Sequence, residues 1–203
     1  RQVEEGYIDG ADGFLIAEPS SSNRIINAHK GSLQYEIIAT GKPAHSSMPE
    51  IGIDSIQLMV DYINETNKRF AKAFNEAENK QLGKTLNVNT VIDGGTQINS
   101  VAGKTILKAN ARCVPEVNND KVVEIIEEVI SDLNSKNQGK LELNILQNNP
   151  NAVSEKDNDL VKAILNSLDK KIPVEALAGA TDASNFGRIS DKYDLAIFGP
   201  GEA

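Results

Sequence analysis

The chain has 203 residues, of which 39% are apolar and 25% are charged, so it can bury one sizeable core or two modest ones. Its formal net charge of -8 and its 4% of aromatic residues argue against a nucleic-acid partner, which needs clustered Lys and Arg or a base-stacking surface. No apolar run approaches the ~20 residues that span a bilayer, and the first residues lack the pattern of a signal peptide. We therefore expect a cytoplasmic globular protein that binds no membrane.

The first predicted element is a short apolar run at residues 13–17, which is typical of a buried strand and carries Glu18 at its carboxyl end. Ligands bind at the carboxyl ends of strands in open α/β sheets. Before this strand, Glu4 and Glu5 are expected to form a solvated helix end. The glycine-rich start and the final Gly-Pro-Gly segment lead us to expect a piece of a longer protein.

The middle of the chain predicts a compact α+β unit. A strand at residues 32–40 is followed by a helix from about 52 to 78, two strands at 86–92 and 105–114, a helix with apolar residues from Val122 to Leu133, and a strand at 140–146. The order β-α-β-β-α-β is that of the split βαβ, ferredoxin-like sandwich.

The pattern changes after Asn148-Asn-Pro150. A helix around residues 160–168, an extended segment at 173–177, a loop of small residues at 178–184 and a strand at 195–198 alternate as in an α/β layer. We therefore predict that residues 31–147 form one domain, inserted between two parts of another domain at 1–30 and 148–203.

Several segments carry a family resemblance over nearly the whole chain. The blocks IAEPSS, AHKGSLQYEIIATGKPAHSSMPE, IDGGTQINSV, ARCVPE, GATDAS and IFGPG occur in this order. Together they resemble the zinc-dependent aminoacylase and exopeptidase family, of the succinyl-diaminopimelate desuccinylase, acetylornithine deacetylase and carboxypeptidase G type. The resemblance implies a catalytic α/β domain that is interrupted by a ferredoxin-like lid, through which two subunits form a homodimer.

The chemistry that this resemblance implies is metal-assisted hydrolysis of the amide in an N-acyl amino acid. Two Zn²⁺ ions per subunit, which Co²⁺ can replace, polarise the carbonyl and activate a water molecule. Within this family, the sequence blocks are most similar to those of the branch that cleaves N-succinyl-diaminopimelate. The alternatives are an acetylornithine deacetylase, a dipeptidase of the same family, or a dimerisation module without activity.

Glu18 is the one zinc ligand of the family that these residues supply, so we expect them not to bind zinc by themselves. From the sequence alone, a cap of the turn before Pro19 is the favoured role of Glu18, and only the resemblance favours a zinc ligand. The single cysteine, Cys113, excludes an internal disulfide framework and a thiolate metal cluster, and we expect it to be a buried apolar filler because no base neighbours it in the sequence.

His45 is one of only two histidines, and it lies in a turn-rich segment between Pro43 and Pro49. It could simply face water, while Ser46 or Ser47 is the better candidate for a helix cap. The resemblance implies a catalytic role, in which His45 reaches into the partner subunit's site and hydrogen-bonds the oxyanion at the scissile carbonyl. The other histidine, His29, is expected to hydrogen-bond across the domain hinge.

Four further residues are implied in substrate binding by the resemblance, and each has a simpler explanation. Arg112 could be a surface charge, although arginine suits a terminal carboxylate. Asn99 could serve a tight turn, whereas the family places it near the partner's substrate. Gly179 and Thr181 could belong to a helix start, capped by Thr181 or Asp182, whereas the family places this loop against the substrate carboxylate.

Overall fold

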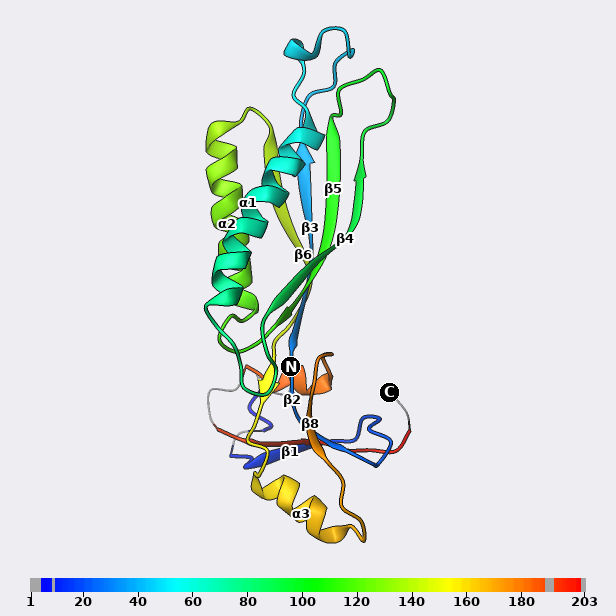
Figure 1. Cartoon of the computed structure of the whole chain (residues 1–203), viewed down its shortest axis with the longest axis vertical. Helices are drawn as coiled ribbons and strands as arrows, with labels where there is room; N and C mark the ends of the chain where they lie inside the picture. The colour runs from blue at the N-terminus through cyan, green and yellow to red at the C-terminus, as the bar shows by residue number, and fades with distance from the viewer. Residues whose placement is uncertain (1–4, 9, 189–191, 202–203) are drawn as a thin grey trace.

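The computed structural model describes residues 5–8, 10–188 and 192–201, and it contains two β-sheets that follow one another along the long axis of the molecule (Figure 1). Glu4, which is half of the expected N-terminal helix end, lies outside the described residues. The upper sheet is antiparallel, with the strand order β4-β5-β3-β6. Its strands are β3 (Gly31–Thr40), β4 (Leu86–Gly94), β5 (Lys104–Cys113) and β6 (Lys140–Asn149).

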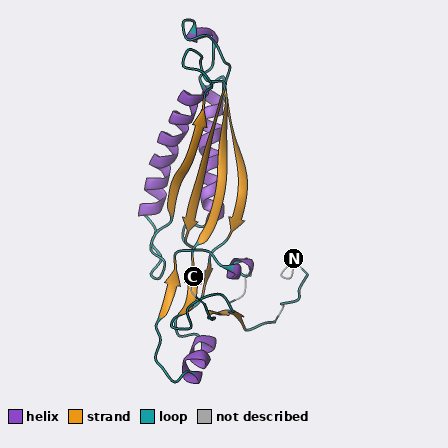
Figure 2. Ribbon diagram, turned by 90° about the vertical axis from the view of Figure 1, so that its right-hand side faces the viewer, coloured by secondary structure: helices purple, strands orange, loops and turns teal. Residues whose placement is uncertain are grey.

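Two long helices, α1 (Ser55–Asn75) and α2 (Asn119–Lys136), cover one face of the upper sheet and leave the other face open (Figure 2). The chain order β3-α1-β4-β5-α2-β6 is the predicted β-α-β-β-α-β order, so the ferredoxin-like fold is confirmed. We call this unit the lid.

Each lid helix begins at a side chain that accepts hydrogen bonds from the first turn. The Asp54 carboxylate accepts from the backbone N–H groups of Ile56 and Gln57, and Asn118 accepts from that of Lys121. Such caps each stabilise a helix by about 1 kcal/mol. Ser46 and Ser47 therefore do not cap α1, and that prediction was wrong.

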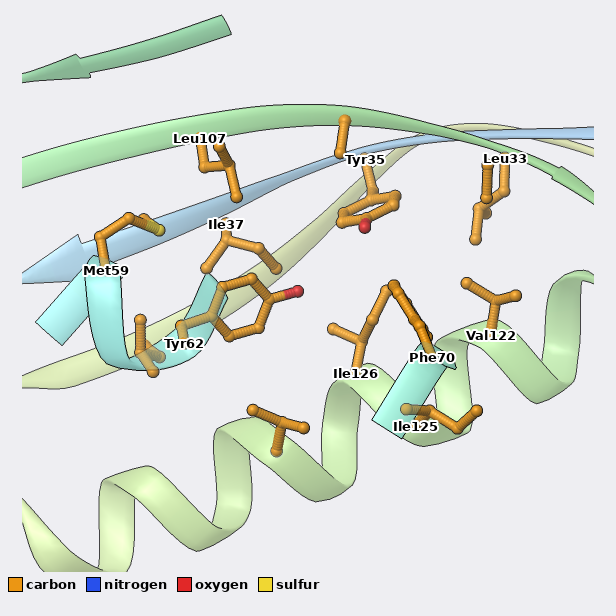
Figure 3. Packing of buried hydrophobic residues seen from close by; sticks show 14 of the residues in the cluster. Leu33, Tyr35, Ile37, Met59, Tyr62, Phe70, Leu107, Val122, Ile125 and Ile126 are labelled. Carbon is orange, nitrogen blue, oxygen red and sulfur yellow. The ribbon is translucent and has the colours of Figure 1, made fainter. Parts of the chain in front are cut away.

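The lid core lies between the sheet and the two helices (Figure 3). Alternate residues of β3, namely Leu33, Tyr35 and Ile37, are fully buried against Tyr62 of α1 and Ile126 of α2. Burial of one such side chain contributes about 1.5–3 kcal/mol of transfer free energy. The period of two along the strand and the helical spacing of the partners make this packing predictable from the sequence.

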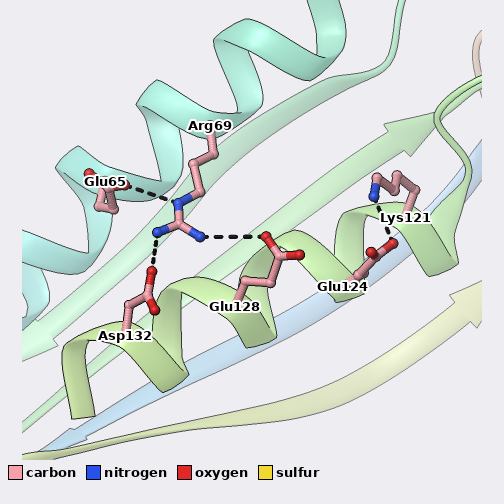
Figure 4. A network of polar contacts seen from close by, with 6 residues as sticks. All are labelled: Glu65, Arg69, Lys121, Glu124, Glu128 and Asp132. Atoms are coloured by element: carbon pink, nitrogen blue, oxygen red, sulfur yellow. Dashed lines mark hydrogen bonds and ion pairs between the residues drawn. The ribbon is translucent and has the colours of Figure 1, made fainter. Parts of the chain in front are cut away.

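A charged network joins the outer surfaces of α1 and α2 (Figure 4). The guanidinium of Arg69 donates to Glu65 on its own helix at 3.0 Å, and to Glu128 at 3.5 Å and Asp132 on α2. These hydrogen bonds hold the pKa of the Glu65 and Asp132 carboxyl groups below their usual range. Arg69 thus ties the two helices together at their exposed side.

Within the part of the chain that the structure describes, the lower sheet has five strands. These are β1 (Gly13–Ile16), β2 (Ile25–His29), β7 (Ala152–Val153), β8 (Val174–Leu177) and β9 (Asp194–Ile197), with the helix α3 (Asp159–Ser167) beside them. The pairs β1–β9 and β2–β8 are parallel, whereas β2–β7 and β2–β9 are antiparallel. We call this part the base, and it agrees with the expected α/β layer except that β2 and β7 were not predicted.

The junction between the base and the lid is buried. His29 ends β2 with no exposed surface, and its Nδ1 hydrogen-bonds the carbonyl oxygen of the adjacent Lys30 at 2.8 Å instead of a group across the hinge. Cys113 is also fully buried, and burial raises the pKa of its thiol to about 12, which keeps it protonated and confirms its role as a core filler. None of the helices in the described part of the chain has the length and apolar character needed to cross a membrane.

Candidate functional site

A polar cavity of about 360 Å³ lies where the open face of the lid sheet meets the base. Its lining comes from both parts of the chain and contains Glu18, Ser32, Gln34, Arg112, Gln147, Asn149, Ala180, Thr181 and Asp182. Three residues that the sequence predicts for a site, Glu18, Arg112 and Thr181, are thus brought together although they are far apart along the chain.

Glu18 leaves the carboxyl end of β1 and is half-buried. Its Oε1 accepts a hydrogen bond of 2.5 Å from the backbone N–H of Asp182. Two serines that follow, Ser21 and Ser22, adopt left-handed backbone conformations with φ of 58° and 47°, and such conformations cluster at functional sites. The Glu18 carboxylate is therefore held by the Asp182 amide, and the chain after it turns through the left-handed conformations of Ser21 and Ser22.

Gly199 allows this turn to approach the end of β9. An added Cβ at Gly199 would lie 2.6 Å from the carbonyl oxygen of Glu18, and the N–H of Gly199 donates to the hydroxyl of Ser20 at 3.1 Å. The Ser20 N–H donates in return to the Gly199 carbonyl. The blocks IAEPSS and IFGPG thus form one hydrogen-bonded unit around Glu18.

Arg112 lies on the open face of the lid sheet, in a row of polar side chains. Ser32 on β3 stands directly opposite Arg112 on β5 and Asn149 on β6. The next residues on the same face form a second row, in which Gln34 is flanked by Asn110 and Gln147. No salt bridge of Arg112 occurs within the described residues, so its guanidinium is available to an anionic ligand.

The loop of small residues after β8 contributes to the cavity through Ala180, Thr181 and Asp182. Thr181 also caps the short helix η2 (Asp182–Asn185), because its hydroxyl accepts from the N–H of Ala183, and the predicted cap is confirmed. Gly179 is next to the cavity but does not line it. The amide of Asp182, which could have bound an anion, is occupied by Glu18.

The loop after β3 and the loop between β4 and β5 meet at the far tip of the lid (Figure 1), and they carry a second group of predicted residues, His45 and Asn99. The loop after β3, which contains the short helix η1 (Pro49–Ile51), pairs with the loop between β4 and β5. The N–H of Ser46 donates to the carbonyl of Asn99 at 2.9 Å, and the N–H of Val101 donates to that of Ala44 at 2.8 Å. His45 and Asn99 are both exposed, as are Met48, Ile51 and Ile98 beside them.

The two groups lie at opposite ends of the same sheet. Ser32, at the cavity, is the second residue of β3, and Thr40, which leads to His45, is its tenth and last residue. At ~3.3 Å per residue, the tip is roughly 30 Å from the cavity. His45 therefore cannot reach the cavity of its own chain in this conformation.

Four residues that line the cavity were not predicted, namely Ser32, Gln34, Gln147 and Asn149. On β3, Ser32 and Gln34 alternate with the buried Leu33 and Tyr35, so the period of two placed them on the open face, whereas β6 has no such alternation around Gln147 and Asn149. Their proximity to Arg112 depends on the strand register, which the sequence alone did not specify.

The described residues do not make up a metal centre by themselves. No three His, Cys, Asp or Glu side chains converge within the described ranges. A catalytic zinc ion normally takes three protein ligands, so Glu18, a hard oxygen donor at a strand end, fits only as one member of such a set.

Comparison with known proteins places this geometry in a family. Residues 27–138 match the M20 peptidase dimerisation domain. The chain is 35% identical to a probable succinyl-diaminopimelate desuccinylase of Staphylococcus aureus, over 98% of this chain and 56% of that protein. It is 30% identical to the acetylornithine deacetylase of Buchnera aphidicola, over 67% of this chain and 36% of that protein.

Solved structures share the fold. The aminopeptidase PepT of Bacillus cereus superposes with a TM-score of 0.71 at 18% identity, covering 94% of this chain and 49% of that one. A tripeptidase of Staphylococcus aureus gives a TM-score of 0.69 at 21% identity, covering 96% of this chain and 50% of the other.

The chain belongs to the M20 peptidase family, whose dimerisation domain it contains as the lid. It spans about half the length of the curated relatives it matches, at 56% of the desuccinylase.

Proposed function

We propose that this chain is part of a zinc-dependent hydrolase that cleaves the amide of an N-acyl amino acid, with N-succinyl-diaminopimelate as the leading substrate. The names of its relatives, a desuccinylase and a deacetylase, support an acyl group on an amino acid. The polar cavity beside Arg112 supports a substrate with a carboxylate.

The observation that carries the proposal is the separation of the two groups of site residues. Glu18, Arg112 and Thr181 lie at the base, and His45 with Asn99 lies roughly 30 Å away, at ~3.3 Å per residue of β3. A second copy related by a twofold axis, with its sheet antiparallel to the first, brings each tip to the other copy's base. We therefore assign one composite site to each half of a homodimer.

The edge strand β4 is the surface that best fits this pairing. Its large apolar residues Leu86, Val88, Val91 and Ile92 are each more than half exposed, and Ile56 and Val60 of the adjacent helix α1 are exposed as well. An unpaired apolar edge strand is a template for a second strand. Pairing of β4 with its copy extends the lid sheet across the dimer.

The residues have the following roles in the composite site. Glu18 is one ligand of the zinc ions, which supply carbonyl polarisation and an activated water when bound. Arg112 binds the substrate carboxylate, Thr181 and the partner's copy of Asn99 contact the substrate, and Gly179 belongs to the loop that presents Thr181. The partner's copy of His45 donates a hydrogen bond to the oxyanion that forms at the scissile carbonyl.

The experiment is a complementation assay on the protein that carries this chain. His45→Ala is expected to lower kcat by roughly a hundredfold or more with zinc content and dimerisation intact. An equal mixture with Glu18→Ala should regain about a quarter of the wild-type activity, because half of the dimers are hybrids that keep one intact site of two. Absence of recovery in proven hybrids would exclude the role of His45 across the interface.

The substrate is tested separately with zinc- or cobalt-loaded protein. N-succinyl-diaminopimelate is expected to give the highest kcat/KM among a panel that includes N-acetylornithine and dipeptides. A higher kcat/KM on either of the other two would move the assignment to that branch, and no hydrolysis of any substrate would leave a dimerisation module without activity.

A further inference from the structure

The ring of His45 is held by the residue two positions after it. Its Nδ1 lies 2.8 Å from the hydroxyl oxygen of Ser47, and the backbone N–H of Ser47 points at the same Nδ1 from 3.2 Å. The N–H of Met48 donates to the His45 carbonyl at 2.9 Å and closes the turn. Both the hydroxyl and the backbone N–H of Ser47 thus contact Nδ1 of the imidazole.

These two contacts define which ring nitrogen carries the proton. A backbone N–H can only donate, so Nδ1 must present a lone pair to it. The hydroxyl of Ser47 can donate to the same lone pair. If Nδ1 carried a proton, two donors, the Nδ1–H and the N–H of Ser47, would point at each other without an acceptor. In the neutral imidazole the single proton is therefore on Nε2.

We propose that Ser47 is a positioning residue, which keeps Nδ1 of His45 as an acceptor and so places the N–H donor on Nε2, at the outer edge of the ring. The catalytic meaning of this arrangement rests on the proposed function, because an oxyanion is stabilised by a donor that is already oriented towards it. Ser47 itself touches neither the substrate nor the metal in this assignment.

The backbone of the tip fixes the direction in which this donor faces. His45 forms a bridge with Ser100, and the N–H of its neighbour Ser46 is bonded to the Asn99 carbonyl. Pro49 restricts the backbone of Met48, at the end of the turn. The ring is exposed, but its backbone and its Nδ1 are both held, which is the condition for a preorganised donor.

The other histidine holds the opposite tautomer and serves as an internal reference. Nδ1 of His29 faces the carbonyl oxygen of Lys30, which can only accept, so its proton is on Nδ1. Its Nε2 is buried and has no hydrogen-bond partner among the described residues. The two histidines of the chain should therefore give different nitrogen spectra.

The test is ¹⁵N NMR of the chain with labelled histidine, at a pH where both rings are neutral. We expect one ring protonated at Nε2, assigned to His45 by its loss in His45→Ala, and one protonated at Nδ1. Ser47→Ala should shift the His45 signals towards a mixture of tautomers, Ser47→Thr should restore them, and the neighbouring Ser46→Ala should leave them unchanged. A ring of His45 protonated at Nδ1 in the wild type, or unchanged signals in Ser47→Ala, would overturn the proposal.

Kinetics on the protein that carries this chain supplies the second readout. Ser47→Ala should lower kcat by roughly fivefold, the scale of one hydrogen bond, at unchanged KM, and Ser47→Thr should recover it. Equal kcat values in Ser47→Ala and the wild type would overturn the positioning role. The NMR spectra do not depend on enzymatic activity. A failure of the complementation assay can therefore be distinguished from a failure of the tautomer proposal.

Discussion

At the scale of single residues, Gly199 illustrates how a close backbone approach supports the site. A Cβ at this position would meet the Glu18 carbonyl oxygen at 2.6 Å, which is backbone and cannot rotate away. We predict that Gly199→Ala lowers the free energy of unfolding by about 1–3 kcal/mol, and urea titration measures this. Gly179→Ala is the matched control, because its added Cβ would lie 3.7 Å from the nearest side chain, at ordinary contact distance. Equal midpoints for the two variants would contradict the prediction.

His29 makes the stability of the junction depend on pH. Burial lowers the pKa of this imidazole from 6.5, so the folded protein takes up a proton less readily than the unfolded chain. The stabilisation is fully present above about pH 6.5 and is lost as the pH falls below it, by at most about 1.4 kcal/mol per pH unit.

Unfolding by urea between pH 7.5 and 5 measures this effect of His29. The loss of stability should become smaller in His29→Gln, which has no titrating ring, and should persist in His45→Ala. The same slope in all three proteins would assign the acid sensitivity to other groups.

At the scale of elements, the Arg69 network makes the packing of α1 on α2 sensitive to salt and acid. The carboxyl groups of Glu65 and Asp132 have lowered pKa values because Arg69 donates to them, so this stabilisation is present at neutral pH and is lost as the pH falls through those values. We predict that Arg69→Met lowers the melting temperature at low salt, with a smaller difference at high salt.

The control for this prediction is Lys68→Met on the same helix. The Lys68 ammonium lies 4.0 Å from Glu65 and its side chain is 80% exposed, so its removal should change the melting temperature little. An Arg69→Met variant that melts like Lys68→Met would show that the network does not stabilise the helix pair.

The edge strand β4 gives a prediction about assembly. Val88→Lys places a charge on a strand that pairs with its own copy in the proposed dimer, and we expect dimerisation to weaken by at least about tenfold. Leu146→Lys, on the opposite edge strand β6, is the control, since Leu146 is also exposed, at 51%. Light scattering at tens of micromolar distinguishes a dimer from a monomer, and a larger loss in Leu146→Lys would place the interface at β6.

The lid was predictable from the sequence because its signals are local. Helical spacing of apolar residues specified α1 and α2, and the period of two specified β3 and β5. The strand β2 was missed, since Ile-Ile-Asn-Ala-His has no alternation and is buried at every position by β7, β8 and β9. Its strand character comes from tertiary pairing.

The candidate site was predictable only in part. The resemblance named His45 and Asn99, but the two loops that carry them are joined by a hydrogen bond from the Ser46 N–H to the Asn99 carbonyl, and no local signal in the sequence indicates that pairing. The bond between Glu18 and Asp182 links residues that are 164 positions apart, so it depends on the whole fold.

At the scale of the whole molecule, the ligand set predicts how this chain behaves alone. The described residues contain no convergent group of three metal-ligating side chains, and Glu18 is the one zinc ligand that we propose among them. We expect the isolated 203-residue chain to bind no zinc pair and to hydrolyse no N-acyl amino acid. Metal analysis after dialysis, together with an amide hydrolysis assay, measures both, and stoichiometric zinc with activity would contradict the expectation.

The ten paired residues of β3 and β5 set the distance between the tip and the base, and in the proposed dimer that distance is a requirement of catalysis. An insertion of two residues in each strand of the lid preserves the inward and outward alternation, so the core can still pack. It would nevertheless displace His45 by ~7 Å, at ~3.3 Å per residue. In the proposed dimer, strand length is therefore under a constraint that folding alone does not impose, because the length of the sheet sets the position of a catalytic side chain.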